Sequence, residues 1–182
     1  HDWGVFVGPE CRYGQSNGAC TSFSGGSAML LFNKRFAMGV TMQHSLDRRF
    51  SPAGVSPLAL RSAFGGAKLE YTLMPNSAVH VTFPLLLGAG IARADSLRTL
   101  LRPGHLHGID ENGPSNGLRS EYFIVQPGVQ IEANLLRWAK LYVGAHYRIA
   151  SRIGDEVSAA PGNSLQGASI SAGLKLGWFD FH

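Results

Sequence analysis

The sequence predicts an all-β protein: an eight-stranded, antiparallel, up-and-down transmembrane β-barrel formed by a single domain over residues 1–182. Three observations support this prediction. Apolar residues alternate with small or polar residues in one segment after another, the connections between these segments alternate between short and long, and aromatic residues gather at two levels along the strands. Alternation with a period of two indicates a β-strand with one apolar and one polar face.

The clearest alternation lies in residues 139–149, where every odd position is apolar or aromatic and the even positions carry Lys, Tyr, Gly, His and Arg. The same pattern recurs from Ile170 to Trp178. The chain has no run of about eighteen apolar residues, so its sequence offers no candidate for a transmembrane helix. Residues 23–32 alternate poorly, which makes the second expected strand the weakest of the set.

The order of the elements supports an up-and-down meander. Eight strands are expected, at residues 2–10, 22–32, 36–46, 62–73, 78–94, 120–135, 139–151 and 165–179. Hairpin-sized turns at 33–35, 74–77 and 136–138 join three pairs of them, and long polar connections at 11–21, 47–61, 95–119 and 152–164 join the others. Alternate connections of a meander lie at the same end. One end therefore has short turns and both termini, and the other has four long loops, as in bacterial outer-membrane barrels.

The polar parity of the strands predicts what fills the barrel. An eight-stranded interior is just wide enough to be filled by side chains, and buried charges must be paired. We therefore expect a structural network of interior salt bridges and hydrogen bonds. An alternative is an interior that titrates protons or binds a solute, with His80, Glu132 and His146 as the groups involved. The expected interior residues are Lys68, Glu70, His80, Gln126, Gln130, Glu132, His146, Arg148 and Lys175.

The aromatic residues predict two girdles, one at each membrane interface. The girdle at the short-turn end would contain Trp3, Phe36, Tyr71, Trp138 and Trp178, and the girdle at the long-loop end would contain Phe23, Phe64, Tyr122 and Phe123.

Several strand segments resemble small outer-membrane β-barrels that are common in Bacteroidetes-type bacteria. The resemblance rests on residues 65–71, on the Pro-Leu-Leu-Leu-Gly-Ala-Gly core of residues 80–90 and on the Val-Gln-Pro-Gly-Val-Gln-Ile-Glu core of residues 122–132. It implies a location in the bacterial outer membrane, among lipids that include lipopolysaccharide, with extracellular loops and periplasmic termini. It carries over no catalytic residues, since most such barrels have no assigned function.

Three smaller features give further expectations. Cys11 and Cys20 flank a turn-rich stretch, and we expect them to form a disulfide. Pro84 and Pro127 lie inside expected strands, where each removes a backbone donor, so we expect β-bulges there, or alternatively a lateral opening of the wall. The third long connection contains weak metal-ligand candidates, but their spacing matches no established zinc pattern and a solvated loop is the default: His105, His107 and Asp110.

These expectations favour a non-enzymatic structural or interaction protein, whose loops bind a partner or which docks as an accessory subunit of a larger outer-membrane complex. The net charge of +4 is scattered without a basic run, so we expect no nucleic-acid partner, and nothing indicates a cofactor. One alternative is a lipid-modifying barrel enzyme of the lipid A acylase or deacylase kind, which needs a serine activated by a histidine. Ser120, Ser151 and Ser169 are candidates, but nothing in the sequence pairs them with one. A further alternative is a soluble, lipocalin-like carrier.

Overall fold

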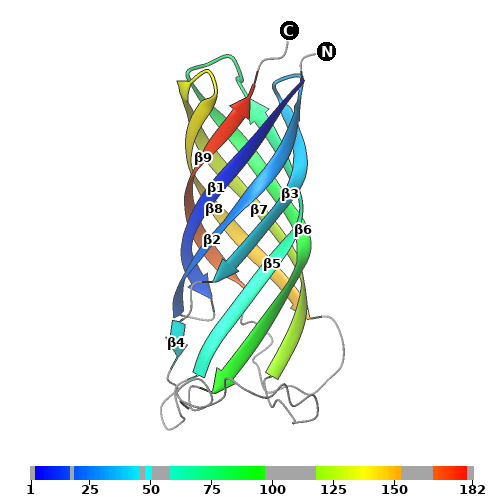
Figure 1. The fold of residues 1–182 in the computed structure, drawn as a ribbon, viewed down its shortest axis with the longest axis vertical. Helices are drawn as coiled ribbons and strands as arrows, with labels where there is room; N and C mark the ends of the chain where they lie inside the picture. Colours follow the sequence, from blue (N-terminus) through cyan, green and yellow to red (C-terminus); the bar gives the residue numbers. More distant parts are fainter. Residues whose placement is uncertain are drawn as a thin grey trace, which may run out of the picture.

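The computed structural model describes residues 3–16, 19–45, 48–50, 58–96, 118–152 and 166–179. These residues form one closed antiparallel β-barrel, which confirms the predicted fold class (Figure 1). Its strands are β1 (Trp3–Ser16), β2 (Ala19–Phe32), β3 (Phe36–Ser45), β4 (Arg48–Phe50), β5 (Leu58–Leu73), β6 (Val79–Ser96), β7 (Leu118–Leu136), β8 (Ala139–Arg152) and β9 (Gly167–Trp178).

The nine strands make an eight-stranded wall. Consecutive strands are paired with each other except β3 and β4; β1 also pairs with β9, and β3 pairs with β5 to close the ring. The three residues of β4 pair with the stretch of β5 that lies beyond its contact with β3. Strands β3 and β4 therefore pair with successive stretches of β5 and together count as one of the eight strands of the wall.

The first long connection that we predicted, at residues 11–21, is wrong. Strand β1 continues to Ser16 and β2 begins at Ala19, and these two residues are paired. The register sets Cys11 opposite Ser24 and Cys20 opposite Gln15. The apolar alternation is weak in this hairpin, and its glycines and serines are typical of a loop. The backbone nevertheless remains paired.

The two ends of the barrel differ in the way that the connection lengths predict. The turns at residues 33–35, 74–78 and 137–138 lie at one end, the upper end in Figure 1, together with Trp3 and Phe179, the first and last described residues. We call this the turn end and the opposite end the loop end. At the turn between β2 and β3, Asn33 and Lys34 have φ angles of 49° and 58°, the left-handed conformation that a tight hairpin turn requires.

The outer surface of the wall is a continuous apolar band. Large apolar side chains on every long strand are exposed, among them Val40 and Met42 of β3, Ile131 of β7 and Ile170 of β9. Polar and charged residues lie in the interior instead. An apolar outside around a polar inside is the arrangement of a transmembrane barrel, the inverse of a soluble one. Within the described residues, no helix is long and apolar enough to cross a membrane.

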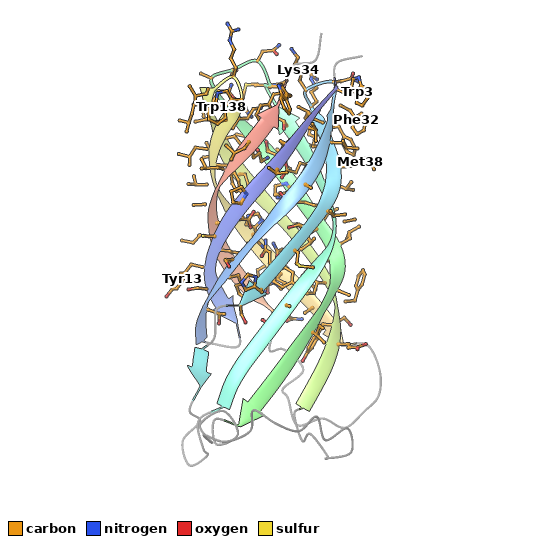
Figure 2. All side chains as sticks on the ribbon, in the orientation of Figure 1. Trp3, Tyr13, Phe32, Lys34, Met38 and Trp138 are labelled. Atoms are coloured by element: carbon orange, nitrogen blue, oxygen red, sulfur yellow. The ribbon has the colours of Figure 1, made fainter. Side chains whose placement is uncertain are left out.

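The aromatic prediction is correct at the turn end and mostly wrong at the loop end. Trp3 and Trp138 lie at the turn end in Figure 2, and all five predicted residues there are exposed. Of the four predicted at the loop end, only Phe123 is exposed. The other three point inward, because their positions have the interior parity: Phe23, Phe64 and Tyr122. The outward aromatic residues toward the loop end are Tyr13, Phe123 and Tyr147.

Candidate functional site: the sealed barrel interior

The centre of the barrel holds an interior ion network that consists of Glu10, Arg12, Lys68, Glu70, Glu132 and Lys175. Lys175 Nζ lies 2.5 Å from Glu70 Oε2 and 2.5 Å from Glu132 Oε1, so one ammonium bridges carboxylates from two other strands. Lys68 Nζ lies 2.9 Å from Glu70 Oε1. All of these side chains are exposed by 5% or less. Buried charges of this kind are tolerated only when they are paired, and here they are.

Glu10 is the second centre of the network. Its Oε1 accepts hydrogen bonds from the Arg12 guanidinium and from Gln43 Nε2 at 2.9 Å. Its Oε2 accepts a hydrogen bond from the Tyr142 hydroxyl at 2.6 Å and lies 3.8 Å from Lys68 Nζ. Contacts through Glu10 therefore connect β1 with β3, β5 and β8.

All nine interior residues expected from the sequence are buried, with exposures of 1–5%. His80 Nε2 lies 3.1 Å from Glu132 Oε2, and Arg148 Nε donates to Gln126 Oε1 at 3.2 Å. Gln130 is buried, but its amide has no hydrogen-bond partner among the described residues. The structure thus joins His80, Glu132, Lys175, Glu70 and Lys68 in one chain of contacts. It places His146, Arg148 and Gln126 nearer the loop end with other partners.

Glycines on neighbouring strands make room for the largest interior side chains. Tyr142 is paired with Gly173, and a Cβ at Gly173 would lie within 2.6 Å of the Tyr142 ring. His146 is paired with Gly128, where a Cβ would collide with the imidazole. Bulky residues therefore fit inside an eight-stranded barrel because the opposite position has no side chain.

Apolar clusters close the interior on both sides of the ion network. The turn-side cluster consists of Phe6, Met29, Leu31 and Ala37, with Phe179 packed against it. The loop-side cluster consists of Phe23, Phe64, Leu86, Tyr122, Ile124 and Ala150. The Arg148 guanidinium lies 4.6 Å from the Phe23 ring centre and 4.3 Å from that of Phe64, which covers its charge with aromatic faces.

The space left in the middle of the barrel is small. A cavity of about 10 Å³ lies beside Arg12, Gln43 and His146, enough for about one water molecule. A larger hollow of about 1110 Å³ lies at the turn end, bordered by the turns and by Trp178 and Phe179. Around the ion network, the described part of the interior is therefore filled by side chains.

The prolines interrupt the ladder without the bulges that we expected. Pairing between β6 and β7 stops after Thr82 with Gln130 and resumes at Leu85 with Pro127, so each strand advances by three residues across the gap. Because no residue is inserted, the register is unchanged and neither proline sits in a bulge. The β7–β8 ladder is likewise interrupted at Pro127. Pro84 is buried and Pro127 is exposed, and a lateral opening between them stays a prediction.

The structure does not show the predicted disulfide, because Cys11 is an exposed, free thiol. Its register partner on β2 is Ser24, and Cys20 precedes Ser24 by four positions on that strand. The weak metal candidates His105, His107 and Asp110 lie outside the described residues. Among the residues that are described, no group of three or more histidine, cysteine or acidic side chains is arranged to hold a metal ion.

Two serine–histidine pairs occur that the sequence did not reveal. His146 Nε2 lies 2.8 Å from Ser171 Oγ inside the barrel, and His44 Nε2 lies 3.1 Å from Ser24 Oγ on the outer face. A serine nucleophile needs a histidine that is oriented by a third group. The other ring nitrogen of His146 has no hydrogen-bond partner in the described part of the chain. The buried pair is therefore an element of the packed interior.

Sequence reasoning missed three central interior residues: Glu10, Arg12 and Tyr142. The expected first strand ended at Glu10, so Arg12 and Gly14, which continue its parity, were assigned to a loop. Continuing the period of two past Cys11 would have placed Arg12 inside. Tyr142 has the polar parity of its strand, but the expected interior set was drawn from Lys, Arg, Glu, Gln and His residues and did not include it.

Comparisons with solved structures agree with this architecture. Neisserial surface protein A matches with a TM-score of 0.61 and 14% identity, over 96% of this chain and 96% of that one. Ail, the attachment invasion locus protein of Yersinia pestis, matches with a TM-score of 0.55 and 10% identity, over 97% and 98%. The N-terminal β-barrel domain of Pseudomonas aeruginosa OprF matches with a TM-score of 0.55 and 9% identity, over 96% and 97%.

A second Ail structure contains the heparin analogue sucrose octasulfate. No protein-family model and no curated protein matches the sequence. At these identities the likeness establishes the fold: a small eight-stranded barrel of the kind found in outer membranes.

Proposed function

We propose that the chain is a non-enzymatic outer-membrane barrel that anchors surface loops, which bind a partner or dock the barrel onto a larger complex. The observation that carries this proposal is the sealed interior. Ion pairs fill the centre, apolar clusters cover both sides of them, and the space between Arg12 and His146 holds about one water molecule. Such a wall offers no path for solutes, which leaves the connections as the surfaces for binding.

We place the loop end outside the cell and the turn end in the periplasm, with lipopolysaccharide as the surrounding lipid. The alternation of short and long connections supports this orientation, since outer-membrane barrels have short periplasmic turns. The sulfated ligand of Ail suggests a polyanionic surface partner as one class to test. Origin in a Bacteroidetes-type bacterium remains part of the proposal on the basis of the sequence resemblance alone.

Accessibility in intact cells tests the orientation. An epitope inserted within residues 97–117 should be detected on unpermeabilised cells, and the same epitope in the turn at residues 33–35 should be detected only after permeabilisation. The reverse pattern would refute the orientation. Binding is then tested with a barrel in which residues 97–117 are shortened, against immobilised heparin and against purified outer-membrane complexes. Equal binding by the shortened and complete barrels would exclude this connection as the binding surface.

One observation favours a second candidate, the lipid-modifying enzyme. The Ser24–His44 pair lies on the outer face, where an acyl chain could reach it. Mass spectrometry of lipid A from cells with and without the protein tests this candidate, and Ser24→Ala is the matched variant. A change in acylation that Ser24→Ala abolishes would replace the non-enzymatic proposal, and an unchanged acyl pattern would remove the candidate.

A further inference from the structure

A small polar cavity lies where the interior ion network meets the loop-side cluster. It is lined by Arg12 and Lys68 of the network and by Leu86 of the cluster, together with Gln43 and His146. Its volume of about 10 Å³ fits one molecule of the size of water. The hydrogen-bonding atoms around the cavity determine which molecule of that size can bind there.

Arg12 supplies a hydrogen-bond donor. Its Nε and Nη2 both donate to Glu10 Oε1, the first at 3.0 Å. Because the guanidinium group is planar, its third nitrogen, Nη1, then points away from this carboxylate. Nη1 is buried and has no hydrogen-bond partner among the described residues. A guanidinium nitrogen can only donate, so Nη1 needs an acceptor.

Gln43 supplies a hydrogen-bond acceptor. Its Nε2 donates to Glu10 Oε1 at 2.9 Å. This contact fixes the orientation of the amide, because the opposite orientation would place the amide oxygen against a carboxylate that can only accept. Gln43 Oε1 is therefore directed away from Glu10, and within the described part of the chain this buried atom has no hydrogen-bond partner.

His146 adds a third unpaired atom. Its Nε2 lies 2.8 Å from Ser171 Oγ, and its buried Nδ1 has no hydrogen-bond partner in the residues that the structure describes. The side chains of Arg12, Gln43 and His146 are exposed by only 3–5% and come from three different strands, yet all of them line the same cavity. Buried polar groups are nearly always hydrogen-bonded, so three unpaired atoms on side chains around one cavity indicate a polar ligand.

We propose that this cavity is a binding site for one water molecule, which accepts a hydrogen bond from Arg12 Nη1 and donates one to Gln43 Oε1. The combination of a fixed donor and a fixed acceptor selects water over an ion of similar size. A halide ion would be repelled by the amide oxygen of Gln43, and a metal cation would be repelled by the guanidinium of Arg12. Water has one further donor and one further acceptor position, which suits either tautomer of His146.

The bound water connects the ion network on β1 and β3 with the His146–Ser171 pair on β8 and β9. The apolar clusters lie between the cavity and the two ends of the barrel, so we expect this water to exchange slowly with the solvent. The proposal concerns the interior of the wall. It therefore does not depend on which partner the connections bind or on which end faces outward.

The first test is a crystal structure of the full chain that resolves ordered water, from crystals grown once in chloride and once in bromide. We expect a density peak within about 2.7–3.2 Å of both Arg12 Nη1 and Gln43 Oε1. We also expect this peak to show no anomalous scattering at the bromine absorption edge. An anomalous peak would overturn the proposal in favour of an anion site. A direct hydrogen bond between Arg12 and Gln43, without a density peak between them, would also overturn it.

The second test removes both proposed hydrogen-bonding atoms. The double variant Arg12→Lys/Gln43→Met keeps a cation beside Glu10. Gln130→Met is the matched control, because Gln130 is also a buried glutamine with an unpaired amide but is not among the described residues that line the cavity. In a deuterated barrel with labelled methyl groups, we expect a nuclear Overhauser effect from water to the Leu86 methyls in the wild type and the control.

This signal should be lost in the double variant, and its persistence there would overturn the proposal, as would its loss in the Gln130→Met control. Heat-modifiable gel mobility verifies that each variant is folded. If the double variant does not fold, Gln43→Met alone should reduce the Leu86 signal relative to Gln130→Met, and equal signals in these two variants would refute the role of Gln43.

Discussion

Replacing Lys175 with methionine tests whether paired charges hold the barrel together. Lys175 Nζ contacts both Glu70 and Glu132 at 2.5 Å, and its side chain is 4% exposed. Methionine has most of the volume of the lysine side chain. However, it leaves the interior ion network with three carboxylates and only two cations. Glu70 keeps its ion pair with Lys68 at 2.9 Å. Of the two ion-pair contacts of Glu132, with Lys175 and with His80, only the one with His80 is left. Removing one partner of a buried ion pair costs about 3–5 kcal/mol, and we expect that loss in the free energy of unfolding.

The double variant Lys175→Met/Glu132→Gln separates this effect from lost packing. It removes the stranded carboxylate, so we expect it to recover more than half of the loss. Equilibrium urea unfolding of the reconstituted barrel measures both variants by tryptophan emission, because Trp3 and Trp138 lie at the turn end (Figure 2) and Trp178 is paired with Val5, two residues from Trp3. Arg35→Met, at an exposed turn position, is the control and should change stability by less than about 0.5 kcal/mol. A cost below about 1 kcal/mol for Lys175→Met, or simple additivity in the double variant, would refute the reasoning.

Three further outcomes are expected. Gly173→Ala should lower the free energy of unfolding by about 1–3 kcal/mol, because its Cβ meets the Tyr142 ring; a neutral result in the same urea assay would mean that the ring is not confined there. The wild-type barrel should give no steady conductance in planar bilayers, and open channels at rest would contradict the sealed interior. Cys11, exposed on the outer wall, should react with a membrane-soluble maleimide and resist a polar one, whereas rapid labelling by the polar reagent would place it in water.

The sequence predicted the wall of the barrel well, because face and period are local properties. Each inward residue from Lys68 to Lys175 was found by counting parity from an apolar neighbour. The length of β1 was not predictable in the same way. Gly14, Asn17 and Gly18 are turn signals in the sequence, and only the pairing of β1 with β2 keeps the backbone on either side in the ladder. The aromatic residues at the loop end were assigned to the membrane interface because they are aromatic. The parity of Phe23 and Phe64 in their strands places these two inside the barrel.

Contacts between distant strands were beyond the sequence for a different reason. Glu10 and Tyr142 share a hydrogen bond of 2.6 Å across 132 residues, and the fit of Tyr142 against Gly173 depends on one exact register of β8 against β9. A shift by one residue would move every side chain of a strand to the other face. The alternation in the sequence therefore predicts which residues face the interior, whereas the strand register determines which of them are in contact.

The poor alternation of β2 follows from the layered interior. Met29 and Leu31 hold inward positions where the other strands carry polar groups, because they belong to the apolar cluster that covers the turn side of the ion network. The loop-side cluster does the same through Phe23 at the other end of this strand. With water excluded on both sides, the ion pairs between the clusters act in a medium of low dielectric constant, which strengthens them and makes any loss of a partner costly. The ion network and the two apolar clusters that cover it therefore stabilise the wall from within.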